Sequence, residues 1–370
     1  MPKFLPSKYY ADDKDVHDIL SSPKISLKML LAIARHRGIF LSEESPREEV
    51  VHYMSMLPFS WPQIQEVMGE IEREDREEKL TTCKIEASAQ LDQVEQAFQK
   101  MREIRGEALN ENYDVTQTKD GQLLVKVTYT EPDLQKARLI QRRQKEAVFE
   151  ITKKGDVLGV RHTQNDKTND ILNQIIDSLV APDAPHKPVR KTIELSGVNN
   201  HEHRTQFFLN VFRGMEGFQL REVKDLKVDR LDEIDTADVS DEEDEPETEA
   251  SREVLKALVR KIALSGENIL ISPQYQQMTK DGFFISKAVW TSIETVGAGR
   301  LVEFEAEFKN ATGGSGFAYQ VRGVYDRDSD GEVATSKGDV SDAEKNMLRN
   351  CLETAAYASV ETINKLEKGN

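Results

Sequence analysis

The residues of this 370-residue chain that are best suited to chemistry are basic ones gathered between positions 134 and 154. They are Lys136, Arg138, Arg142, Arg143, Lys145, Lys153 and Lys154, against two acidic residues in the same segment. Guanidinium forks match phosphate oxygens, and clustered positive charge gains free energy by releasing counterions from a polyanion. The segment is therefore the predicted contact with DNA or RNA. The alternative is a solvated basic face that pairs with acidic residues elsewhere in the chain.

Familiar catalytic and cofactor motifs are absent from the sequence, including Walker A, HExxH, the dinucleotide glycine pattern and the nucleophile elbow. His201 and His203 are two residues apart and would point apart on a helix, with no further ligand nearby to complete a zinc site. Asp326–Gly331 begins like a calcium loop, but its twelfth position is Lys337 where such loops carry Glu. We therefore expect no metal and no cofactor, and catalytic residues stay unknown. An enzyme without a recognisable motif is left open.

The formal net charge of −16 is concentrated in one tract. Residues 232–249 contain eleven acidic side chains and no basic one. A block of like charges repels itself and cannot bury a core, so residues 231–250 are predicted to be a disordered acidic linker. The same tract could compete with nucleic acid for a basic surface of the chain. Two isolated cysteines, no secretory signal and no apolar run of roughly 20 residues predict a cytoplasmic protein without membrane contact.

Residues 1–60 are predicted to form a helical hairpin module, in which two short amphipathic helices span residues 25–57. Ser26 can cap the first helix, and Gly38 can leave it with a positive φ. The second helix is expected to open with a capping box between Ser45 and Glu48. An extended apolar link joins the two helices.

Three short stretches of this module resemble the SAP-like helix-extended-helix family: Leu30-Leu31, Arg37-Gly38-Ile39 and Val50-Val51. Such modules often touch DNA backbones, so the resemblance implies phosphate contacts by Arg35 and Arg37. The family's basic approach to the second helix is replaced here by the acidic stretch 43–49. The alternative is a helical hairpin used for packing or protein contacts.

A heptad pattern follows the module, and residues 61–110 are predicted to be a long helical, coiled-coil-like spacer. Leu80, Ala87, Val94 and Met101 recur every seven residues, with Leu91 and Phe98 on the companion row. The partner of this seam over residues 80–105 is either a second copy of the chain, giving a homodimer, or another helix of the same chain.

The pattern then changes to short strands and helices, which predicts two sheet-plus-helix domains at residues 111–230 and 251–370. Turn residues at Lys119-Asp120-Gly121 and at Gly155 indicate two hairpins, and a helix is expected between them from Pro132 to about Lys145. Val189–Gly197 resembles residues 259–266 and indicates a possible internal repeat, although chance similarity is an equal alternative. The predicted fold class is therefore α+β and multidomain.

These observations favour a cytoplasmic, non-enzymatic binding protein that associates with nucleic acid through the basic face at residues 134–154, helped by Arg35 and Arg37. The competing interpretation is a protein–protein adaptor or complex subunit that binds no nucleic acid. An enzyme of unfamiliar design is the third class.

Overall fold

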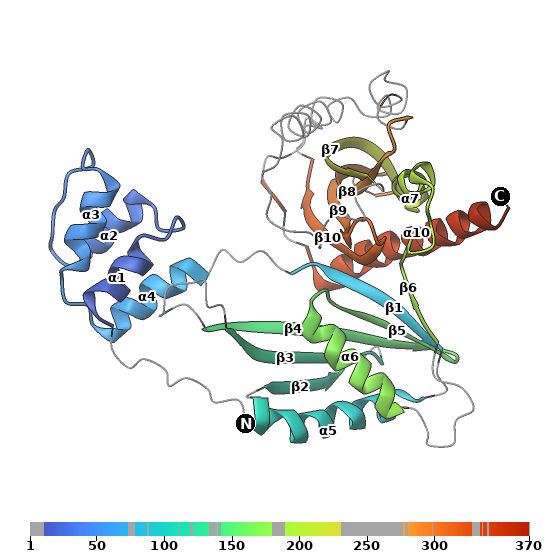
Figure 1. The fold of residues 1–370 in the computed structure, drawn as a ribbon, viewed down its shortest axis with the longest axis horizontal. Helices are drawn as coiled ribbons and strands as arrows, with labels where there is room; N and C mark the ends of the chain where they lie inside the picture. Colours follow the sequence, from blue (N-terminus) through green and yellow to red (C-terminus); the bar gives the residue numbers. More distant parts are fainter. Residues whose placement is uncertain are drawn as a thin grey trace, which may run out of the picture. The chain divides into compact units, whose positions relative to one another are not determined.

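A computed structural model shows a mixed α+β chain with helices and a large antiparallel sheet (Figure 1). It describes residues 11–72, 78–86, 89–109, 111–118, 121–132, 139, 142–179, 189–230, 277, 280–297, 299–327, 334, 336–338 and 340–369. The predicted acidic linker and the second copy of the proposed repeat lie outside these residues. So do Lys136 and Arg138. No helix in the described part of the chain is long and apolar enough to cross a membrane.

The chain divides into two compact units, residues 1–78 with 91–149 and residues 79–90 with 150–370. The first unit contains α1 (Asp13–Leu20), α2 (Leu27–His36), α3 (Arg47–Ser55), α4 (Trp61–Glu72), α5 (Leu91–Leu109), β2 (Asn112–Gln117) and β3 (Leu123–Pro132). Strand β4 (Arg142–Lys154) begins in the first unit and ends in the second. The second unit contains β1 (Leu80–Glu86), β5 (Val157–Thr163), α6 (Asp166–Leu179), β6 (Val189–Thr192), α7 (His201–Gly214), β7 (Phe218–Arg230), β8 (Phe283–Glu294), β9 (Leu301–Asn310), β10 (Ser315–Tyr325) and α10 (Asp342–Gly369).

Helices α1 to α4 share a small apolar core and form the N-terminal helical module (Figure 1). Ser26 accepts a hydrogen bond from the Met29 amide at 3.3 Å, and Gly38 has a φ of 76°, so both predicted boundaries of α2 are confirmed. The predicted capping box of the next helix is wrong. Helix α3 starts after Pro46, and no side chain caps its first amides.

Arg47 instead fastens the start of α3 to the turn between α1 and α2. Its guanidinium donates to the carbonyl oxygens of Leu20 at 3.1 Å, Ser22 at 2.8 Å and Ile25 at 3.1 Å. These carbonyl groups lie between the end of α1 and the start of α2, where backbone carbonyls lack hydrogen-bonding partners within a helix. A single cation therefore satisfies several backbone acceptors and fixes the angle between the helices.

The predicted continuous heptad helix is wrong at its start. Leu80–Glu86 form strand β1, which pairs antiparallel with β5 along its whole length. The helical part of the pattern is α5, whose Val94, Phe98 and Met101 are buried inside the first unit. Helix α5 contacts β2 and β3, and the ring of Phe98 lies 5.5 Å from that of Phe149. The apolar seam is therefore filled by the same chain.

Both predicted hairpins are present, with Gly121 and Gly155 at positive φ in their turns. The helix predicted between them is wrong where the structure describes it. Pro132 ends β3, and β4 already begins at Arg142. Buried side chains at every second position of β4, such as Phe149 and Ile151, favour a strand because alternate residues of a strand share a face.

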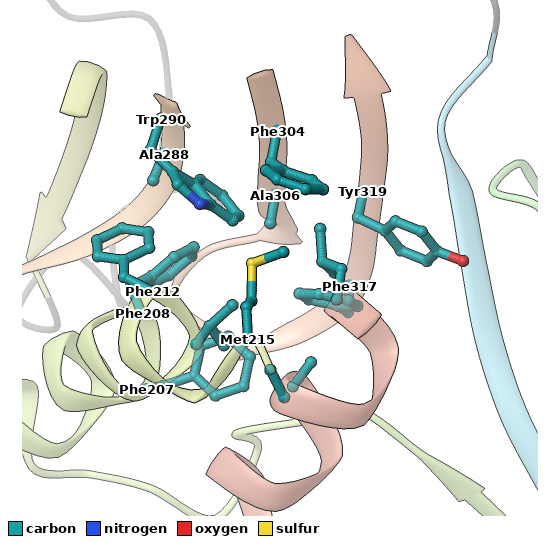
Figure 2. Packing of buried hydrophobic residues seen from close by; sticks show 14 of the residues in the cluster. Phe207, Phe208, Phe212, Met215, Ala288, Trp290, Phe304, Ala306, Phe317 and Tyr319 are labelled. Carbon is teal, nitrogen blue, oxygen red and sulfur yellow. The ribbon is translucent and has the colours of Figure 1, made fainter. Parts of the chain in front are cut away.

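The sheet of the second unit has the strand order β5-β1-β10-β9-β8-β7, and β6 also pairs with β1. Helices α7 and α10 pack together on one face of it. Rings from α7 point toward rings on the strands, and Phe212 lies 4.8 Å from Trp290 between ring centroids (Figure 2). Strands β7 and β8 pair directly and share this core. The structure thus joins the end of the predicted 111–230 domain to the predicted 251–370 domain.

Candidate functional site

The basic segment singled out from the sequence does not form one helical face. Arg142 and Lys145 both lie in strand β4, and Arg143 stands between them. The ammonium of Lys145 contacts Glu131 at 2.6 Å and Glu78 at 3.2 Å. Burial alone would lower its pKa, but hydrogen bonds to the two carboxylates outweigh burial and raise it. Lys145 is therefore a charged residue whose charge is already neutralised within the chain.

The two lysines at the other end of the segment have different environments. Lys153 donates to the backbone carbonyl of Ala89 at 2.8 Å, so its ammonium is tied to its own chain. Lys154 is exposed at the start of the hairpin turn. Of the three basic side chains that the structure describes in residues 134–154, those of Lys145, Lys153 and Lys154, the side chain of Lys154 is the exposed one.

The two arginines of the N-terminal module have different environments. Arg37 donates to the carbonyl oxygen of Pro58 at 2.5 Å, and its guanidinium lies 4.4 Å from the ring centroid of Phe59. Arg35 is exposed and has the carboxylate of Glu43 at 4.0 Å. Arg37 therefore holds the α2–α3 link against the segment after α3, whereas Arg35 faces solvent.

Large exposed apolar side chains stand close in the sequence to Arg37 and to its partners Pro58 and Phe59. Phe40 is 82% exposed, Met56 61% and Trp61 43%. Met56 and Trp61 flank the Pro58-Phe59 pair that Arg37 touches, and Phe40 follows Arg37 by three residues, a reach of about 10 Å. We call these three residues the apolar patch. Soluble monomers rarely leave several large apolar side chains exposed together unless the surface binds something.

The surroundings of the apolar patch are acidic. Residues 11–72 contain eleven acidic side chains and six basic ones. Glu49 and Tyr53 are both exposed, and they precede Met56 by seven and three residues. At this helical spacing they lie on the same face as Met56. Exposed Glu43 and Glu44 follow Phe40 in the link. The rim of the patch therefore carries negative charge.

A second group of charged residues, in the second unit, was missed by the sequence analysis. Along β9 apolar residues alternate with charged ones, a sequence pattern typical of a sheet with one wet face. Glu303 is nevertheless only 7% exposed and Glu305 4%. Glu305 meets Lys79 at 2.6 Å and Lys287 at 2.9 Å. Burial would raise the pKa of Glu305, but hydrogen bonds from these two lysines lower it below its usual value.

The neighbouring Glu303 completes this network of ion pairs on the sheet. It accepts a hydrogen bond from the Tyr325 hydroxyl at 2.9 Å and meets Lys224 and Arg322, each at 3.4 Å. Burial, followed by the hydrogen bond to Glu303, raises the pKa of Tyr325. Each carboxylate is paired with cations from other segments of the second unit, so the network holds these segments to β9. In the sequence, the repetition of Glu at every second position of β9 was the available sign of this network. The cations could not be identified in the same way, because they come from distant segments.

A third polar cluster joins β5 to α10. Arg161 donates to Glu150 at 2.6 Å, to Glu353 at 2.6 Å and to Asn350 at 2.6 Å. Tyr319 also donates its hydroxyl to Glu353. Burial, followed by the charge of Glu353, raises the pKa of Tyr319 well above its usual value, so the phenol stays neutral. The isolated sequence around Arg161 gives no sign of this cluster, because its partners are up to 192 positions away.

A buried histidine lies on the other face of the sheet. His162 is fully buried, and its Nδ1 lies 2.7 Å from the carbonyl oxygen of Thr163. Burial lowers the pKa of His162 to about 4, and the charge of Arg190 acts in the same direction. Arg190 itself donates to Asn169 and Asn173 of α6. The imidazole is thus held neutral by burial and by the nearby charge of Arg190.

The histidine pair at residues 201–203 opens α7, where Asn200 caps the helix by accepting from the Glu202 amide at 2.8 Å. His203 contacts Glu367 of α10 at 2.7 Å. Across the part of the chain that the structure describes, no group of three or more His, Cys, Asp or Glu side chains is placed to hold a metal ion. The two internal polar clusters and the buried histidine are best explained as parts of the fold. The surface best suited to meeting another molecule is therefore the apolar patch.

No protein family matches this chain, and no curated protein sequence matches it either.

Proposed function

We propose that this chain is a binding protein, an adaptor or complex subunit, that docks a protein partner through the apolar patch of its N-terminal module. The observation that carries this proposal is the exposure of Phe40, Met56 and Trp61, each within a few residues of Arg37 or of its partners Pro58 and Phe59. Residues such as Leu30 and Met54 fill the module's core, so the patch is additional to what folding needs. Burying a side chain such as Phe or Met contributes about 1.5–3 kcal/mol, so covering the patch would give substantial affinity.

The double substitution Phe40→Ser/Met56→Ser should remove most protein capture by the full-length chain, because it removes two of the patch's apolar side chains. The measurement is quantitative mass spectrometry of proteins retained from extracts of the source cells by each immobilised variant. The matched control is Val296→Ser/Met347→Ser, which removes exposed apolar side chains of the second unit. Equal thermal melting of the variants would show that folding is intact. Equal capture by both double variants would contradict the docking function.

Nucleic-acid association is a second candidate, favoured by one specific observation. Lys28 and Arg35 are exposed on α2 seven residues apart, hence on one face, and His36 follows at the helix end. Helical modules of the SAP-like kind, which this segment resembles, contact phosphates with such residues. Acidic residues outnumber basic ones in residues 11–72, so the module as a whole repels a polyanion. For this reason nucleic-acid association is the second candidate.

Replacing Lys28 and Arg35 with Glu should weaken binding to duplex DNA, single-stranded DNA or RNA if this candidate is right. Each lost phosphate contact removes about one unit from the slope of log affinity against log salt. A salt titration by fluorescence anisotropy measures that slope, and Lys154→Glu reports on the hairpin separately. An unchanged slope in every variant, or no binding by the unaltered chain, would rule the candidate out.

A further inference from the structure

The charge around the apolar patch restricts what can cover it. Glu43, Glu44 and Glu49 are exposed, the first two shortly after Phe40 in the link and the third seven residues before Met56 on the same helix face. Arg35 is an exposed cation five residues before Phe40 in the sequence, and the carboxylate of Glu43 lies 4.0 Å from it. A partner that covers the apolar side chains must bring its own rim against these carboxylates. Opposite charge at a rim steers association and excludes wrong partners.

We infer that the partner is a protein segment with an apolar face flanked by Lys or Arg residues, an inference that rests on the proposed docking function. Such a segment buries Phe40, Met56 and Trp61 under its apolar side chains and places its cations against Glu43 and Glu49. Amphipathic segments are a recurring ligand of apolar surfaces on helical modules.

One apolar residue from a basic stretch of the chain already packs against the module. Leu139 packs against the core of the N-terminal helices. In the sequence, Leu139 stands in the basic stretch that includes Arg138 and Arg142. An apolar side chain from a positively charged stretch therefore meets this acidic module within the chain itself.

Two other occupants are less compatible with the charges. A second copy of the module would bring the same excess of acidic over basic side chains in residues 11–72 toward this rim. A nucleic acid would bring phosphates toward the carboxylates of Glu43 and Glu49. Both would add repulsion where a basic protein segment adds attraction.

Trp61 offers a direct reporter for the test. The chain has two tryptophans, and Trp290 is fully buried, so acrylamide quenching reports mainly on Trp61. The probe is a synthetic peptide of Leu and Lys with Leu at helical spacing, about 18 residues long. The expected result with the full chain is protection of Trp61 from acrylamide and a blue-shifted emission, with an affinity that falls as salt rises.

Matched controls separate the patch from general charge attraction. Phe40→Ser/Met56→Ser should raise the dissociation constant for the Leu/Lys peptide at least about tenfold, because the apolar contacts are lost. Val296→Ser/Met347→Ser should leave the constant unchanged. A peptide of the same composition in scrambled order should give little protection. Binding to the acidic tract at residues 232–249 would be equal in all variants.

The inference is overturned if a Leu/Glu peptide protects Trp61 equally or if the Leu/Lys peptide binds the patch variant unchanged. Protection of Trp61 by oligonucleotides alone would assign the surface to nucleic acid. Protection that rises with protein concentration alone would assign it to a second copy. Patch-dependent protein capture without peptide binding would reject only the basic partner, whereas loss of both would reject the docking function as well.

Discussion

Replacing Arg161 with Met is expected to lower the free energy of unfolding by about 3–5 kcal/mol, the usual effect of breaking a buried ion pair by removing one partner. Arg161 is the cation between Glu150 and Glu353 and also holds Asn350 of α10. Without the guanidinium, two largely buried carboxylates would lose their main counter-charge. Urea unfolding of the full-length chain, followed by circular dichroism, measures the change.

Arg349→Met is the matched control, because Arg349 also contacts Glu150, at 3.2 Å, but from a more exposed position. It should destabilise less than Arg161→Met does, because Glu150 keeps its shorter contact with Arg161 at 2.6 Å. The double variant Arg161→Met/Glu353→Gln should recover part of the loss, since it removes one stranded charge. Similar small effects for Arg161→Met and Arg349→Met would show that the cluster does not hold α10 to the sheet.

Acidification should destabilise the fold through His162. Its pKa is about 4 in the folded protein and 6.5 ordinarily, so the unfolded chain binds a proton more readily than the folded one. Stability from this residue is therefore fully present above pH 6.5 and is lost as the pH falls toward 4. A shift of this size corresponds to roughly 3 kcal/mol between those limits, because one pKa unit is about 1.4 kcal/mol.

The measurement compares urea unfolding at pH 7 and pH 4.5 for the unaltered chain and for His162→Phe. The substitution removes the titrating group, so the loss of stability between the two pH values should shrink, whatever its effect at pH 7. An identical pH dependence in His162→Phe would show that another group titrates instead.

The sequence alone determined the elements whose signals are local. Gly121 and Gly155 marked two hairpins because their turns require a positive φ, and Ser26 marked the start of α2 through a bond three residues away. The alternation of Val302, Phe304, Ala306 and Phe308 identified the core face of β9, since alternate residues of a strand point the same way. Of the candidate surface, the sequence indicated the helical module and its exposed Arg35.

Tertiary structure decided whatever depends on distant partners. Leu80–Glu86 fits a heptad by spacing, yet these residues form a strand because Val157–Thr163 supplies their hydrogen-bonding partner. Glu305 looked like a solvated residue, but it is buried because Lys79 and Lys287 come from other segments to neutralise it. The sequence could not predict the exposure of Phe40 either. Hydrophobicity predicts burial, and only the completed packing of α1 to α4 leaves this side chain outside the core.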